Sequence, residues 1–314
     1  MKYIKDIREG ERVLEYYLCK KKENRESKAG KTFLSLKLQD KTGVIDAKVW
    51  DITHDIGQFE EGDIIKIDGQ SNFFQNEMQI KVFKLRKSRE GEYEPTDYIP
   101  CSKQDIEEMY KKVKNIIKSL KNPFVKTMLE NILIKNENIA KSYKTHPAAT
   151  YMHHSYMGGL LEHSLSVAEI CDSLGARYEY VNRDILIAGA LLHDIGKIYE
   201  LAPLPQSEYT DDGQMLGHIV MGVTLISEET AKIPDFPHEL ASVIKHLIIS
   251  HHGEFEYGSP KLPSTSEAII LHFADNIDAK LTTYGEILEK DTTPGKWTAY
   301  QKSFGRYIRK SVIS

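Results

Sequence analysis

The stretch RDILIAGALLHDIGK, at residues 183–197, decides the fold of the C-terminal half of this chain. Its apolar residues predict a helix buried in a bundle, and that helix ends on the adjacent residues His193 and Asp194. A purely structural interpretation makes Gly196 a left-handed helix cap and lets Lys197 compensate the helix dipole. Asp194 would then lie near the negative end of that dipole, which is unfavourable for a carboxylate unless it binds cations.

Further histidines and one aspartate are spread over the neighbouring predicted helices. Of 12 histidines, only His54 lies before residue 145. Each helix supplies one or two potential ligands, as bundle proteins do when they build a metal site from facing helices. The candidates are His163 within 160–174, His193 and Asp194 within 183–197, His218 within 216–232, His251 and His252 within 237–252, and Asp275 within 266–288.

These residue types predict a metal-dependent phosphohydrolase. Imidazole nitrogens and carboxylates suit divalent Mn, Fe, Co or Zn. Asp194 has two oxygens and can bridge two ions, which at a separation of about 3.5–4 Å can share a hydroxide and hold phosphoryl oxygens in line. We therefore expect Asp194 to be catalytic. A helical continuation places Lys197 beside the same site, where its ammonium can hold a substrate phosphate.

Residues 1–88 show the period-2 alternation of β-strands. The order of three strands, a short helix at 52–60 and two further strands predicts an OB-fold, a barrel that often binds single-stranded nucleic acid. Alternation places Leu34, Leu36, Leu38, Ile45, Ala47 and Val49 inside the barrel and Phe33, Ser35, Lys37, Lys48 and Trp50 outside. Outward aromatic rings can stack on bases and lysines can follow phosphates, so Phe33, Lys37, Lys48 and Trp50 are candidate nucleic-acid-binding residues. An ordinary half-exposed barrel surface or an oligomer contact is the alternative.

The predicted fold class is therefore multidomain, with an all-β OB-fold barrel at 1–88 and an all-α bundle at 105–290. The segment 89–104 is polar, contains two prolines and predicts a linker. Capping patterns mark the start of the first helix, at Ser102 and Asp105, and of the last, at Ser264 and Glu267. The tail at 291–314 mixes aromatic and basic residues, which suits a contact with RNA or with a neighbouring copy in a homo-oligomer.

Composition excludes several protein classes. Three widely spaced cysteines argue against a disulfide framework and a CxxC zinc site, and they suit a reducing cytoplasm. No apolar run reaches the roughly 18 residues of a membrane span, and the first residues lack the apolar region of a secretory signal. The net charge of −4 means that any nucleic-acid binding must come from local basic patches.

Longer motifs resemble a known family. The order His163, His193–Asp194, Asp275 resembles the HD-domain phosphohydrolase superfamily. HHSYMGGLLEHS (153–164), LLHDIGK (191–197) and ISHHGEFEYGSPKLPSTSEAIILHFADNIDA (249–279) closely resemble the YhaM family of bacterial 3′→5′ exoribonucleases, over nearly the whole chain. The resemblance implies two metal sites. The first would use His163, His193, Asp194 and Asp275, and the second Asp194, His218, His251 and His252, with His246 as a rival in the second.

From this resemblance we expect a 3′→5′ exoribonuclease that digests single-stranded RNA, with single-stranded DNA as a further substrate and manganese as the first choice of metal. His153, His154 and the pair Gly158–Gly159 would line the substrate mouth, unless they form a plain loop. One alternative is an HD-type phosphodiesterase acting on small or cyclic nucleotides. Another is a non-catalytic nucleic-acid-binding factor with a degenerate HD domain.

Overall fold

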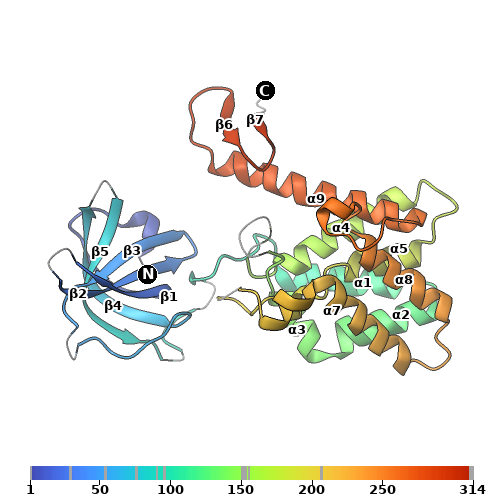
Figure 1. Ribbon diagram of the computed structural model, residues 1–314, viewed down its shortest axis with the longest axis horizontal. Helices are drawn as coiled ribbons and strands as arrows, with labels where there is room; N and C mark the ends of the chain where they lie inside the picture. The colour runs from blue at the N-terminus through green and yellow to red at the C-terminus, as the bar shows by residue number, and fades with distance from the viewer. Residues whose placement is uncertain are drawn as a thin grey trace.

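The N-terminal domain is a closed five-stranded barrel, as predicted (Figure 1). The computed structural model describes residues 2–27, 30–52, 55–74, 77–89, 91–94, 97–149, 154, 156–205 and 208–310. After the short helix η1 (Ile4–Asp6), the strands are β1 (Arg12–Glu26), β2 (Thr32–Asp40), β3 (Gly43–Val49), β4 (Ile64–Phe74) and β5 (Glu77–Lys87). They close in the order β1-β2-β3-β5-β4, with only β3 and β5 parallel among the paired strands described.

Alternation along β2 and β3 fills the barrel interior. The six residues predicted to point inward are buried together in one apolar core: Leu34, Leu36, Leu38, Ile45, Ala47 and Val49. This part of the prediction is confirmed, because a period-2 pattern fixes which face of a strand meets the core.

The short helix predicted at 52–60 is wrong for the residues described there. Ile56 instead forms a β-bridge to Leu85, and the Gly57 amide donates to the Leu85 carbonyl over 2.8 Å. Phe59 is buried in the barrel core. The segment folds as a loop because its backbone groups bond to β5 and its apolar side chains close the barrel.

The second half of the linker bonds to both domains. The Lys41 amide donates to the Asp97 carbonyl, and the Gln39 side chain donates to the Tyr98 carbonyl, which ties this part of the linker to the barrel. Further along, Cys101 forms a β-bridge to Met157 of the helical domain.

The C-terminal domain is a helical bundle around one apolar core (Figure 1). Its elements are α1 (Ile106–Ser119), α2 (Pro123–Glu130), η3 (Asn131–Lys135), α3 (Glu137–Thr145), α4 (Gly159–Gly175), α5 (Arg183–Leu192), α6 (Lys197–Glu200), α7 (Asp211–Lys232), α8 (His238–Ser250), η4 (Phe255–Tyr257) and α9 (Ser266–Lys290). Among the described residues, no helix combines the length and apolar character needed to cross a membrane.

The helix starts differ in part from the predicted caps. Asp105 caps α1, since its side chain accepts from the Glu108 amide. Thr265 rather than Ser264 caps α9, accepting from the Ala268 amide, so the cap lies one residue later than predicted and the predicted capping box does not form. Glu267 accepts from the distant Asn182 amide instead of closing a box with its own helix.

The chain ends in a β-hairpin that the sequence did not predict. Strands β6 (Trp297–Gln301) and β7 (Arg306–Arg309) pair antiparallel. In Figure 1 the end of α9 extends past the other helices and carries this hairpin.

Candidate metal centre

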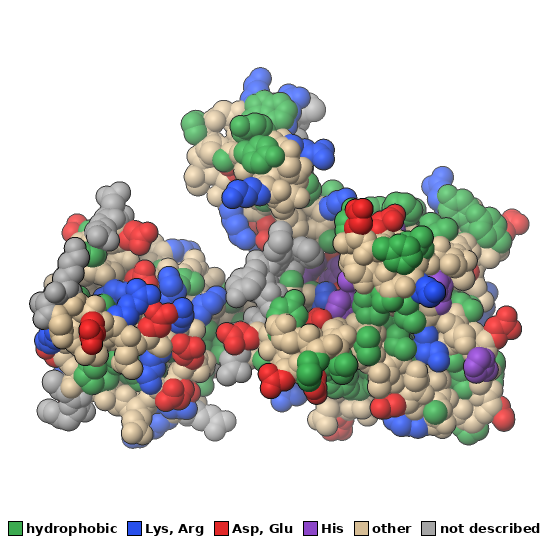
Figure 2. Space-filling model, viewed as in Figure 1, with side chains coloured by type: hydrophobic (Ala, Val, Ile, Leu, Met, Phe, Trp, Pro, Cys, Tyr) green, Lys and Arg blue, Asp and Glu red, His purple; other side chains and the backbone are tan. Residues whose placement is uncertain are grey.

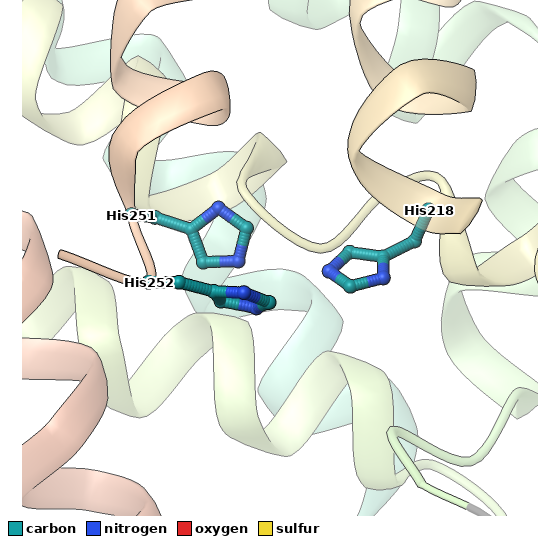
Figure 3. Close-up of side chains that lie close together, drawn as sticks. All are labelled: His218, His251 and His252. Carbon is teal, nitrogen blue, oxygen red and sulfur yellow. The ribbon is translucent and has the colours of Figure 1, made fainter. Parts of the chain in front are cut away.

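The predicted ligands lie together at one place in the bundle, although they come from five helical segments. His163, His193 and Asp275 form one group, and His218, His251 and His252 form another, with ligand atoms within 4.8 Å of one another in each group. Figure 3 shows the second group, in which the imidazole rings converge from α7 and from the end of α8.

Asp194 lies between the two groups, and its two oxygens face different histidines. Oδ2 lies 3.4 Å from His193 Nε2 and 3.6 Å from His163 Nε2. Oδ1 lies 3.5 Å from His218 Nε2 and 3.8 Å from His251 Nε2. A single carboxylate is thus placed so that each oxygen can serve a different cation.

In four of the histidines, a hydrogen bond on the side away from the centre fixes the orientation of the ring. In each, Nδ1 bonds an acceptor outside the centre, which leaves the Nε2 lone pair directed inward, as in most protein metal sites. The pairs are His193 with the Ala190 carbonyl at 2.9 Å, His251 with the Ile248 carbonyl at 2.7 Å, His218 with Glu200 at 3.0 Å, and His163 with Asp278 at 2.7 Å.

The inward-facing atoms fit divalent cations. His218 Nε2 and His252 Nδ1 are buried without a hydrogen-bond partner among the described residues. His163 Nε2 and His193 Nε2 approach each other to 3.1 Å, which requires a proton or a cation between two nitrogen lone pairs. Buried polar atoms normally have partners, so these orphaned nitrogens indicate a missing ligand. Nitrogen and carboxylate donors without a thiolate suit Mn, Fe, Co and Zn.

Electrostatics keep the two carboxylates ionised. Burial alone raises the pKa of Asp194, but Lys197 and His193 lower that pKa well below its ordinary value. Burial likewise opposes ionisation of Asp275, whereas its hydrogen bond to His163 lowers the pKa. Burial also lowers the pKa of His251 well below its usual range, so this imidazole is neutral and free to bind a metal. At Asp194, Asp275 and His251 these effects favour the protonation states that metal ligands need. At His163 burial lowers the pKa, but Asp275 and Asp278 outweigh burial and raise it to about 10, so a metal that binds there must displace a proton.

Lys197 reaches the centre, as the sequence predicted. It is the first residue of α6, and its Nζ lies 2.6 Å from Asp194 Oδ2. Burial lowers the pKa of Lys197, but the Asp194 carboxylate outweighs burial and the pKa is raised. The side chain is therefore a permanent cation beside the shared carboxylate.

Two glycines set the backbone geometry around the centre. Gly196 is not the left-handed cap of the plain structural interpretation, since its φ of −62° is right-handed. Its lack of a side chain serves close packing, because a Cβ there would collide with the carbonyl oxygen of His218. Gly217, with φ of 74°, breaks α7, so that His218 begins a new helical segment and its amide donates to Glu200.

Three of the four residues predicted to line a substrate mouth, His154, Gly158 and Gly159, are buried. His154 is 2% exposed, and its Nε2 lies 3.1 Å from Asp278. Gly158 is the N-cap residue before α4, with φ of 83°, and a Cβ on Gly159 would collide with the His154 carbonyl. Among the described residues of this segment, the buried His154 ring lies beside His163, with centroids 5.3 Å apart. His153 lies outside the described residues.

Asp278 is a functional candidate that sequence reasoning missed. It is buried, accepts from His163 and from the Ser166 hydroxyl, and lies three residues after Asp275 on α9. That spacing placed both carboxylates on one helix face and was the available signal. By contrast, the Nε2 of the rival ligand His246 accepts a hydrogen bond from the Ser264 amide, so this nitrogen is already occupied outside the centre.

On the barrel, the outward residues form a small aromatic and basic patch. Phe33 and Trp50 stack with centroids 4.5 Å apart, and the Lys48 ammonium donates to Ser35. Phe33 is only 9% exposed, because Trp50 covers it. The expectation of an open Phe33 ring is therefore corrected. Trp50 and Lys48 are half-buried and Lys37 is exposed, so these three side chains remain accessible.

Comparisons with known proteins match both domains. The family model described as HD domain matches residues 160–280, and the model described as OB-fold nucleic acid binding domain matches residues 19–87. The chain is 37% identical over 311 residues to a Geobacillus protein named 3′-5′ exoribonuclease YhaM, covering 97% of this chain and 94% of that protein. It is 35% identical over 291 residues to the Bacillus velezensis protein of the same name, with 92% and 91% covered.

Proposed function

This chain belongs to the YhaM family of 3′-5′ exoribonucleases, and we propose that its reaction centre holds two divalent ions that share Asp194. The chain is a metal-dependent exoribonuclease with a nucleic-acid-binding barrel. The two-ion arrangement is supported above all by one observation. The two oxygens of Asp194 face separate groups of inward-directed imidazoles.

The proposed division of ligands follows from these two faces. His163, His193 and Asp275 would hold one ion and His218, His251 and His252 the other, with Asp194 common to both. When bound, the ions would supply an activated water as the nucleophile and neutralise charge developing on the phosphodiester. Manganese is our first choice, with cobalt, iron and zinc as alternatives that the same donors accept.

The remaining groups act on the substrate. We propose that Lys197, a cation beside the shared carboxylate, turns its ammonium to a non-bridging phosphate oxygen of the terminal nucleotide. On the barrel, Trp50, Lys37 and Lys48 would hold the single strand by stacking and charge, with Phe33 supporting the Trp50 ring. The three free cysteines suit a reducing cytoplasm, where we place the enzyme.

An assay on 5′-labelled single-stranded RNA and DNA, run with Mn, Co, Zn or Mg, tests this proposal. We expect RNA to shorten from its 3′ end with Mn, and Asp194→Asn to reduce cleavage by more than the roughly 100-fold typical of outer-shell changes. The matched control is Asp172→Asn, which removes a carboxylate of a half-exposed ion pair with Arg183. If Asp194→Asn cleaves like the wild type, the shared-ligand mechanism is wrong.

The same assay distinguishes an enzyme for small nucleotides. Trp50→Ala together with Lys37→Ala should weaken digestion of long RNA while sparing hydrolysis of a dinucleotide. A chain whose substrates are small or cyclic nucleotides would show no loss on either substrate.

A further inference from the structure

We propose that one face of the C-terminal hairpin is a second binding surface for single-stranded RNA, formed by Trp297, Tyr300, Tyr307 and Arg309. This inference rests on the proposed function in that RNA is the substrate. It assigns a role to the tail, for which the sequence left RNA and a neighbouring copy of the chain equally open.

The hairpin is a fixed element of the domain. An isolated two-stranded hairpin is marginally stable, so it needs packing against other elements. Thr298 and Ile308 provide buried side chains, and the rings of Tyr284 on α9 and Phe304 meet edge to face with centroids 5.9 Å apart. The Lys310 ammonium also pairs with Asp291 at the end of α9. The exposed face therefore has a defined orientation relative to the helix.

Strand register places four side chains on one face. Trp297 pairs with Arg309 and Tyr300 with Tyr307, and directly opposite residues share a face of an antiparallel pair. Tyr307 and Arg309 flank the buried Ile308, so both point away from the core. The residues Trp297, Tyr300 and Tyr307 are 54%, 52% and 60% exposed, and the centroids of the two tyrosine rings lie 5.4 Å apart.

Charge decides between RNA and a second copy of the chain. Residues 292–310 contain no acidic residue and five basic ones, namely Lys296, Lys302, Arg306, Arg309 and Lys310. Figure 2 shows basic and hydrophobic side chains together on the hairpin. Arg309 lies on the proposed face itself, and in a two-fold symmetric dimer it would meet its own copy among the other basic residues of the hairpin, without an acidic partner from the same segment. Stacking rings among positive charges match the bases and phosphates of a single strand.

Position links this face to the reaction centre. The helix α9 carries both the candidate ligand Asp275 and, at its end, the hairpin (Figure 1). About 22 Å of helix separates Asp275 from Lys290, a distance that takes several nucleotides of a single strand to span. A strand with its 3′ end in the centre could thus reach the hairpin several nucleotides upstream, whereas a dinucleotide could not.

The test uses full-length protein carrying Trp297→Ala, Tyr300→Ala and Tyr307→Ala together. Binding of fluorescein-labelled oligoadenylate of roughly 30 nucleotides, longer than one OB-fold covers, is measured by anisotropy in an Asp194→Asn background. Hydrolysis of a dinucleotide is measured with Asp194 intact. We expect the Kd for the long strand to rise at least about tenfold, with the dinucleotide rate unchanged.

Two controls keep the result specific. Tyr178→Ala with Tyr180→Ala removes exposed rings that follow α4, and this variant should bind the oligoadenylate normally. Tyr300→Phe with Tyr307→Phe, in place of the alanine changes at these two positions, keeps the rings and should restore most of the affinity lost with alanine. Restoration shows that stacking, and not the fold of the hairpin, carries the effect.

Several outcomes would overturn the inference. Unchanged affinity of the triple alanine variant for the long strand excludes RNA binding at this face. A change in molar mass by light scattering that accompanies the loss of affinity identifies the face as a self-association surface instead. Failure of the wild type to cleave RNA or dinucleotide at all would contradict the proposed function, while the binding measurement would still decide the role of the hairpin.

Discussion

Asp278→Asn tests whether a carboxylate outside the metal centre determines how tightly the centre binds its ions. The substitution preserves the shape of the side chain and removes its charge. In the wild type, Asp278 accepts from His163 Nδ1 at 2.7 Å, contacts His154 Nε2 at 3.1 Å and accepts from the Ser166 hydroxyl. Both imidazoles contact Oδ2, whereas the Ser166 hydroxyl donates to Oδ1. An amide has a single, uncharged acceptor oxygen, so it cannot accept from the imidazoles and from Ser166 together, and it accepts more weakly from His163.

The size of the effect follows from these contacts. Asp278 is 7% exposed, so water cannot easily replace a lost acceptor. A hydrogen bond to a charged group contributes about 1.5–3 kcal/mol. Loss of an outer partner of a metal-bound histidine lowers metal affinity about 10–100-fold, which corresponds to about 1.4–2.7 kcal/mol. The two ranges agree, and we therefore expect the Kd for manganese to rise about 10–100-fold.

Two titrations measure this effect. Calorimetry without RNA reports manganese binding directly, and a manganese titration of cleavage reports the concentration needed for activity. Excess manganese should restore much of the rate of Asp278→Asn, which a merely misfolded centre would not allow. Asp172→Asn, the same chemical change in a half-exposed ion pair, should titrate like the wild type.

The reasoning fails if Asp278→Asn lowers the melting temperature but binds manganese with unchanged affinity. Asp278 would then stabilise the fold without orienting His163.

Three further substitutions test other contacts of the centre. Glu200→Gln weakens the support of His218 and should lower manganese affinity about 10–100-fold in calorimetry. Lys197→Met should reduce kcat about 100-fold, as loss of one preorganised donor does. It should not weaken manganese binding, because it removes a cation that competes for the shared carboxylate. Weaker manganese binding would contradict this role of Lys197. Gly196→Ala forces a Cβ onto the His218 carbonyl and should destabilise the domain by about 1–3 kcal/mol in denaturant unfolding. Gly285→Ala, at an open helical position, should not destabilise the protein, and equal losses in both would refute the packing argument.

The sequence by itself determined the two domains and the chemistry of the centre. Alternation of Leu34, Leu36 and Leu38 identified the interior of the barrel, because a strand's period fixes its faces locally. Helical patterns and residue types identified the imidazoles and carboxylates, because metal ligands are limited to few side chains. These signals need no knowledge of which segments meet.

Only the tertiary structure decided what those residues contact. Asp278 reaches His163 across 115 residues of sequence, and Glu267 meets Asn182 across 85. The loop at Ile56 became a partner of β5 instead of a helix, and His154 was buried behind the centre instead of opening to substrate. Local periodicity does not predict such partners, since they meet only when distant segments of the chain pack together. Asp194 shows the difference most directly: the sequence marked it as a possible bridge, and packing gave each of its oxygens a different pair of histidines.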